Sequence, residues 1–117
     1  MWLEPIQREL HKDAATTGDG NIQDLFGRYA AGVVQISGSM GVITFRGTVD
    51  GVNWTDLACT NMATGATTAT ATAVGTFKVP VLGLKRFKAE ITTHTGGANR
   101  VSATGCFVAE DVSIGTV

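Results

Sequence analysis

Histidine side chains are the first candidates in this chain for catalysis or metal binding. His11 and His94 lie far apart in the sequence, and neither has Asp, Glu or Cys nearby at the spacing of metal ligands. A lone histidine late in a threonine-rich segment, as His94 is, more often forms a hydrogen bond or faces solvent than binds a metal. The spacing therefore predicts no metal centre at either histidine.

The aspartates are scattered over expected turns and strands. Asp19 and Asp50 each precede a glycine, and Asp tolerates the left-handed backbone that such turns need. The run Asp19-Gly20-Asn21 offers oxygen ligands for calcium, but it lacks the several carboxylates of a tight calcium loop. We interpret both aspartates as turn residues and keep calcium at Asp19 as an alternative.

Two cysteines, Cys59 and Cys106, complete the candidate ligands. They have no CxxC spacing, and a reducing compartment keeps such residues as thiols. Free cysteine is among the most buried residue types, so we expect two buried thiols, with a disulfide or a metal role as the alternative.

Motifs of known chemistry are missing from the sequence: there is no GxSxG, no P-loop and no strand-GxGxxG-helix arrangement. We therefore expect no enzyme, no catalytic residue and no cofactor. Sugar binding is an alternative, because Trp54 or Tyr29 could stack on a sugar ring. Trp54 stands beside a turn between polar neighbours, and we interpret it as an anchor in the core or at an interface rim.

Size and charge limit the classes of function. The chain has 117 residues, enough for one domain around one core. A net charge of −1 with 16% charged residues leaves no basic face for nucleic acid, so direct binding of DNA or RNA is not expected. No signal-peptide pattern and no membrane-length apolar run occurs, which predicts a cytoplasmic protein without membrane contact. The low charge density suits a surface that meets other proteins.

Short β-branched and aromatic runs separated by turn residues predict an all-β fold. Residues 41–57 read as strand, turn and strand, with the turn at Asp50-Gly51. Apolar and polar residues alternate in 86–95 and again in 101–108, and Gly96-Gly97 between them predicts an antiparallel hairpin.

Eight expected strands follow from these patterns, at residues 22–25, 33–37, 42–49, 54–59, 66–73, 76–81, 86–95 and 101–108. Their number and spacing predict a single, jelly-roll-like β-sandwich of about eight antiparallel strands over residues 14–109, followed by a tail at 110–117. The alternating Thr and Ala of 66–73 predict an ordinary sandwich strand or, alternatively, a strand at a subunit contact.

Residues 1–13 differ from the rest in their many charges, and we interpret them as an N-terminal arm. Trp2, Leu3 and Ile6 are its candidate partner-binding residues, because exposed apolar side chains at a terminus are unfavourable in a lone monomer. The arm docks on a neighbouring subunit in this interpretation, and the alternative is that it folds back on its own domain.

Residues 14–108 resemble a β-sandwich module that recurs in virion proteins of tailed bacteriophages. The resemblance depends on the order of five motifs. They are Val-Gln-Ile-Ser-Gly, Ile-Thr-Phe-Arg-Gly-Thr-Val-Asp-Gly-Val-Asn-Trp, Ala-Thr-Gly-Ala, Gly-Thr-Phe-Lys-Val and Gly-Leu-Lys-Arg-Phe-Lys-Ala-Glu-Ile.

The resemblance implies a structural protein of the virion, assembled in the host cytoplasm. A free-standing module with an arm is similar to capsid decoration or head-accessory proteins, which bind the major capsid protein or other virion proteins, often as trimers. Many weak contacts then add through multivalency and stabilise the head. A tail, baseplate or fibre-associated module, with or without carbohydrate binding, is the alternative.

Overall fold

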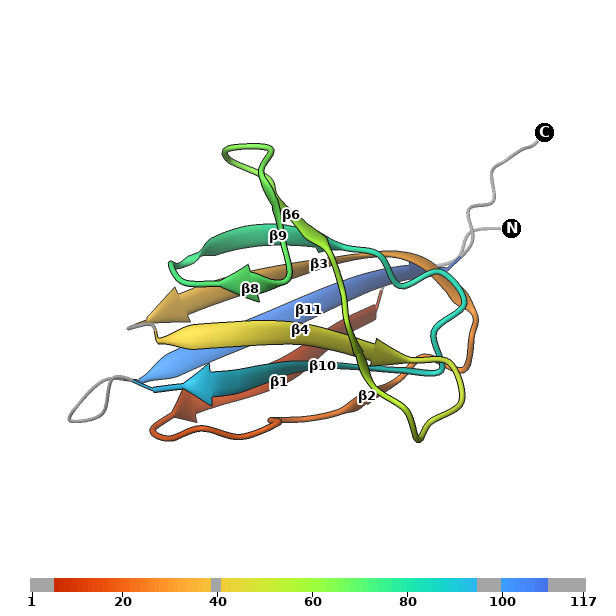
Figure 1. Ribbon diagram of the computed structural model, residues 1–117, viewed down its shortest axis with the longest axis horizontal. Helices are drawn as coiled ribbons and strands as arrows, with labels where there is room; N and C mark the ends of the chain where they lie inside the picture. Colours follow the sequence, from red (N-terminus) through yellow and green to blue (C-terminus); the bar gives the residue numbers. More distant parts are fainter. Residues whose placement is uncertain (1–5, 39–40, 95–99, 110–117) are drawn as a thin grey trace.

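The computed structural model describes residues 6–38, 41–94 and 100–109, and this part of the chain is all-β (Figure 1). Its strands are β1 (Ile6–Ala14), β2 (Gln23–Asp24), β3 (Tyr29–Gly38), β4 (Val42–Thr48), β5 (Thr55–Asp56), β6 (Cys59–Asn61), β7 (Thr67–Thr68), β8 (Thr70–Ala71), β9 (Gly75–Val79), β10 (Arg86–Thr93) and β11 (Val101–Ala109). Over these residues we find no helix with the length and apolar character needed to span a bilayer.

The strands form two antiparallel sheets that pack face to face. The six-stranded sheet has the order β1-β11-β3-β9-β6-β7, and the five-stranded sheet has the order β2-β10-β4-β5, with β8 also paired to β4. The predicted β-sandwich is confirmed, with more strands in the described part than the eight expected.

The first strand and the turn predicted for residues 41–57 form as expected. The second strand, expected at residues 54–59, is only two residues long as β5, and Cys59 begins β6 in the other sheet. Arg46 pairs with Asp56 and Gly47 with Thr55 across the β4–β5 hairpin. Gly51 has a φ of 84° in the intervening turn, a left-handed conformation that glycine adopts without a steric penalty.

Residues 66–73 do not form the single strand expected from their Thr–Ala alternation. β7 pairs with β6 in one sheet, whereas β8 pairs with β4 in the other. Thr68 makes local bonds between them: its Oγ1 accepts a hydrogen bond from the Thr70 amide at 3.1 Å and donates one to the Thr70 carbonyl at 3.0 Å. Side-chain bonds of this kind compete with a strand ladder, and the segment crosses between the sheets here.

The hairpin predicted between 86–95 and 101–108 is wrong. β10 pairs with β4 and β2, whereas β11 pairs with β1 and β3 in the opposite sheet. Both segments alternate as predicted, but each one's hydrogen-bonding neighbours are distant in sequence. A glycine pair indicates where the chain can turn, and it does not decide which strands pair.

The arm predicted for residues 1–13 is wrong for residues 6–13, which belong to β1. This strand pairs with β11, from Ile6 opposite Phe107 to Ala14 opposite Val101, with two register shifts. Leu10 is only 1% exposed and lies in the core. Burial of this side chain stabilises the strand against the sandwich, so the folded-back alternative describes these residues.

Aromatic rings fill the space between the sheets. The Phe45 and Phe77 ring centroids are 5.4 Å apart, and those of Phe87 and Phe107 are 5.7 Å apart in an edge-to-face arrangement. Such pairs add to the free energy gained by burying apolar area. The core therefore joins strands of both sheets, because Phe87 comes from β10 and Phe107 from β11.

Replacing Leu10 by Ala tests whether β1 is part of the folded domain. Truncation of a buried leucine leaves a cavity, so we expect L10A to lower the free energy of unfolding by about 2–5 kcal/mol. Chemical denaturation measures this, with K12A at the exposed Lys12 of the same strand as the control. Equal stability of L10A and the unmodified protein would support an undocked arm instead.

Candidate functional site

Of the predicted partner-binding residues, Ile6 lies within the described part of the chain. Ile6 begins β1 and packs, partly buried, against the core of its own domain. Its side chain therefore contributes to the hydrophobic core of its own domain. Trp2 and Leu3 lie outside the described residues.

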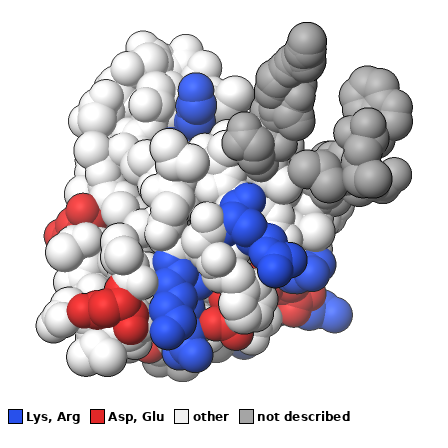
Figure 2. Space-filling view, turned by 90° about the vertical axis from the view of Figure 1, so that its right-hand side faces the viewer, with Lys and Arg blue, Asp and Glu red and all other residues white. Residues whose placement is uncertain are grey.

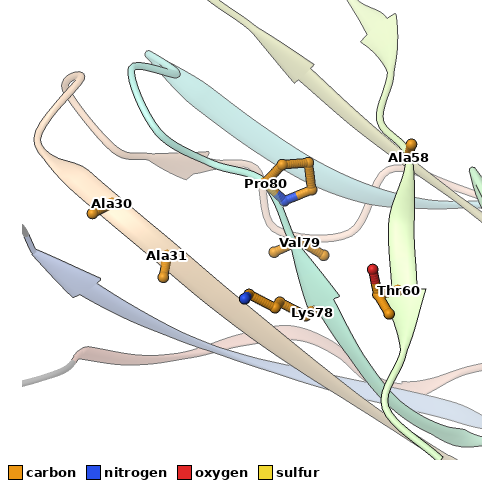
Figure 3. A pocket seen from close by; sticks show the side chains of 7 residues that line it. All are labelled: Ala30, Ala31, Ala58, Thr60, Lys78, Val79 and Pro80. Carbon is orange, nitrogen blue, oxygen red and sulfur yellow. The ribbon is translucent and has the colours of Figure 1, made fainter. Parts of the chain in front are cut away.

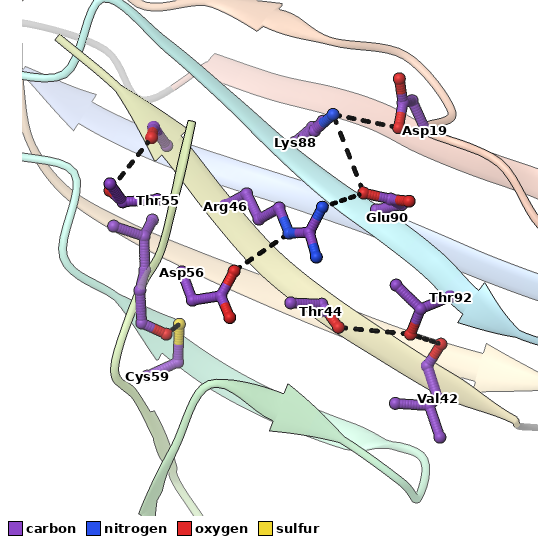
Figure 4. Close-up of polar contacts among 12 residues, drawn as sticks. Asp19, Val42, Thr44, Arg46, Thr55, Asp56, Cys59, Lys88, Glu90 and Thr92 are labelled. Carbon is purple, nitrogen blue, oxygen red and sulfur yellow. Dashed lines mark hydrogen bonds and ion pairs between the residues drawn. The ribbon is translucent and has the colours of Figure 1, made fainter. Parts of the chain in front are cut away.

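Charged side chains gather instead on the outer face of the five-stranded sheet. Arg46 on β4 donates to Glu90 on β10 at 2.8 Å and to Asp56 on β5 at 3.0 Å (Figure 4). The guanidinium thus joins three neighbouring strands. Ion pairs this exposed contribute little individually, about 0–1 kcal/mol each, and we interpret them as bracing of the sheet.

Lys88 is the most buried member of this group, with its side chain 10% exposed. Its ammonium lies 3.1 Å from the Asp19 carboxylate, 3.8 Å from that of Glu90 and 4.6 Å from the centroid of the Trp54 ring. The cation thereby holds the loop that carries Asp19 against the sheet. No group of three or more His, Cys, Asp or Glu that could hold a metal ion is found among the described residues.

The two aromatic residues considered for sugar stacking are both engaged within the domain. Trp54 has the Lys88 ammonium over its ring, and Tyr29 packs against the core with its ring centroid 6.3 Å from that of Phe107. Stacking on a sugar needs an uncovered ring face. The contact between the Lys88 ammonium and the Trp54 ring therefore favours a role for Trp54 in holding Lys88 in place.

Both histidines connect the two sheets. His11 Nε2 lies 2.5 Å from the carbonyl oxygen of Ala89, and His94 Nε2 lies 3.1 Å from that of Ala14. Because a carbonyl oxygen can only accept, each Nε2 carries the proton and donates it. The ring of His11 is also buried beneath Gly20, where any side chain would overlap it. Both histidines therefore hold β1 against the other sheet. His11 on β1 bonds to β10, and His94, which follows β10, bonds to the end of β1.

Asp50 organises the loop between β4 and β5. Its Oδ1 accepts hydrogen bonds from the amides of Val52 and Asn53 at 2.7 and 2.8 Å and from the Thr48 hydroxyl at 2.9 Å. Its Oδ2 accepts one from Asn53 Nδ2 at 2.7 Å. These bonds, the Asn53 amide first, hold the pKa of the carboxyl well below its ordinary 3.8. The turn role predicted for Asp50 is confirmed.

Cys59 and Cys106 are both free thiols. Cys59 is buried in the core, and burial raises its pKa to about 12. Cys106 is half-buried on the outer side of β11. The predicted burial is confirmed for Cys59 and is only partial for Cys106.

A shallow groove lies on the outer side of the six-stranded sheet (Figure 3). It is lined by Ala30, Ala31, Ala58, Thr60, Lys78, Val79 and Pro80. Its volume of about 180 Å³ is below the usual range of small-molecule sites. The groove offers small side chains and one amine, which favour contact with a protein surface over capture of a cofactor.

The lowered pKa of Asp50 predicts that the stability of the fold depends on pH. The pKa is lower in the folded state than in the unfolded state. The stabilisation that the ionised Asp50 gives to the fold is therefore complete at a pH above the unfolded-state pKa, and it is lost as the pH falls toward the folded-state pKa. We expect the stability difference between the unmodified protein and D50N to be constant above about pH 5 and to shrink below about pH 4. Urea unfolding at each pH measures it, and a difference that does not change with pH would contradict the assignment.

The two thiols should differ in reactivity. The thiolate is the reacting form, and burial suppresses it at Cys59. We expect a maleimide to modify Cys106 in the folded protein and Cys59 only after denaturation, as mass spectrometry of the modified peptides would show. In C106S the folded protein should stay unmodified, whereas labelling of Cys59 there would show that the core opens.

Comparisons with known proteins find similarity of fold alone. No family model and no curated sequence matches the chain. The crystal structure of the SPBc2 prophage-derived protein YomS is similar with a TM-score of 0.81 and 19% identity, over 93% of this chain and 96% of YomS. The PBSX exported protein XepA is similar with a TM-score of 0.82 and 18% identity, over 89% of this chain. The match covers 37% of XepA, so this chain spans little more than a third of that protein.

Proposed function

We propose that this chain is a structural protein of a tailed bacteriophage or prophage that acts by docking on other phage proteins. The observation that carries the proposal is the fold shared with a prophage-derived protein over nearly that protein's whole length. The motif order of residues 14–108 supports the same origin. In this role the protein needs no cofactor, catalytic residue or metal.

The two outer faces of the sandwich support a docking function. Outward-facing residues on β3 and β11 include Val33, Gln35, Thr104 and Cys106, none of which is charged. The outer face of the other sheet has the ion pairs centred on Arg46. Interface cores are poor in charged residues, so the part of the six-stranded sheet formed by β3 and β11 is the better candidate for contact with protein.

The specific form that we propose is a capsid decoration or head-accessory protein. It binds the major capsid protein, associates with copies of itself as a trimer, and stabilises the head from the virion surface. Trp2 and Leu3 remain the proposed anchors of this contact, and Ile6 is left out because it packs against its own core. Repeated weak contacts then add through multivalency.

A tail or baseplate module is the second candidate. The similarity to little more than a third of XepA favours it, because the same fold then occurs as one part of a longer protein. In that role the copy number follows the tail symmetry.

The two candidates predict different amounts of the protein in separated phage particles. We expect quantitative mass spectrometry of purified heads and tails to find it on heads, at a copy number comparable to that of the major capsid protein. Particles from a phage that lacks the gene are the control. A few copies on tails would establish the second candidate, and absence from both fractions would refute a virion role.

A further inference from the structure

Four large apolar side chains are exposed on three loops at one end of the sandwich. Phe26 lies between β2 and β3, Val49 and Val52 lie between β4 and β5, and Leu82 lies between β9 and β10. They are 68%, 72%, 76% and 76% exposed, respectively. Their three loops lie at the right-hand end of Figure 1, and we call these four residues the apolar tip. Several large apolar side chains exposed at the same end of a domain favour an interaction site there.

Backbone hydrogen bonds hold the three loops to one another. The amides of Leu25 and Phe26 donate to the Lys85 carbonyl at 2.8 and 3.1 Å, and the Lys85 amide donates to the Thr48 carbonyl at 2.8 Å. Asp50 fixes the third loop through its own bonds. A surface ordered before binding loses less conformational entropy when it docks.

Phe26 has a backbone conformation that is unfavourable for an aromatic residue. Its φ is 55°, in the left-handed region that glycine and asparagine enter far more easily than an aromatic residue. The ring is largely in solvent, with the Arg28 guanidinium 5.6 Å from its centroid. The fold therefore carries local strain without burying the side chain that causes it.

The charges beside the apolar tip indicate the chemistry of its partner. Arg28 and Lys85 have no carboxylate partner within the described part of the chain, whereas Asp24 pairs with Arg86 at 2.8 Å and Asp50 is used in its turn. Because they are unpaired among the described residues, these two cations favour carboxylates around the surface that receives the tip. Acidic and basic residues both gather at this end (Figure 2), unlike the cation-rich face of a membrane anchor.

We propose that the apolar tip inserts into an apolar pocket, bordered by carboxylates, on another phage structural protein. This inference rests on the proposed function and adds to it a further contact surface, separate from the six-stranded sheet. Phe26 and Leu82 fill the pocket, and Arg28 and Lys85 meet its acidic border. The left-handed backbone at Phe26 keeps the ring pointing outward.

Particle binding by variants tests the inference. F26N and L82S remove tip side chains from two loops, and V74S removes an exposed valine from the turn between β8 and β9 as a matched control. Heads and tails from phage that lack the gene are the probe, and co-sedimentation is the readout. We expect V74S to bind as the unmodified protein does and both tip variants to bind at least tenfold more weakly.

Thermal unfolding separates loss of contact from loss of fold. Because asparagine tolerates a left-handed backbone, we expect F26N to melt at the same temperature as the unmodified protein or higher. A more stable variant that no longer binds supports the inference. Equal binding by the unmodified protein, F26N and L82S overturns it.

A second experiment decides the case in which the unmodified protein binds neither heads nor tails. That result refutes the virion role, and a photo-crosslinking phenylalanine analogue at position 26, 82 or 74 then reports on the tip in phage-producing cells. Adducts with one phage protein from positions 26 and 82, absent from 74, support the inference. Absence of adducts from 26 and 82, or tip-dependent binding to phosphatidylglycerol vesicles, overturns it.

Discussion

The packing of Phe107 between the sheets sets the spacing on which the rest of the sandwich depends. Its ring meets Phe87 from the opposite sheet, and Gly32 and Gly105 leave the room that it occupies. A methyl group at Gly32 would stand 2.7 Å from the ring, and one at Gly105 would stand 2.9 Å from it. Glycine is therefore needed at both positions, because a densely packed interior has no volume left for a side chain beside the Phe107 ring.

Most of the described side chains that could take part in catalysis or metal binding form contacts within the sandwich instead. The histidines donate to carbonyls of the opposite sheet, Lys88 lies between two carboxylates and the Trp54 ring, and Arg46 joins three strands. Polar groups near a core need partners, and here the partners are parts of the same domain. What remains without such partners is surface: the uncharged outer side of β3 and β11, and the exposed apolar residues on the three loops of the apolar tip.

The balance between stability and binding is clearest at Phe26. A residue chosen for folding alone would be glycine or asparagine at a φ of 55°, and it would not expose an aromatic ring. The hydrogen bonds that the amides of Leu25 and Phe26 donate to the Lys85 carbonyl hold this left-handed conformation in place. The sequence pattern gave no signal for this residue, because strain is a property of the backbone angle and is not visible in residue type.

The sequence by itself determined where several of the strands and the turn between β4 and β5 form. Alternation in 86–95 placed Phe87, Ala89 and Ile91 on the inner face, and Asp50-Gly51 made the β4–β5 hairpin, since both depend on neighbouring residues only. Only the tertiary structure decided that β10 and β11 lie in different sheets, that residues 6–13 form a core strand, and that three distant loops meet at the apolar tip. These outcomes depend on which distant surfaces bury the most apolar area together, and no local pattern contains that information.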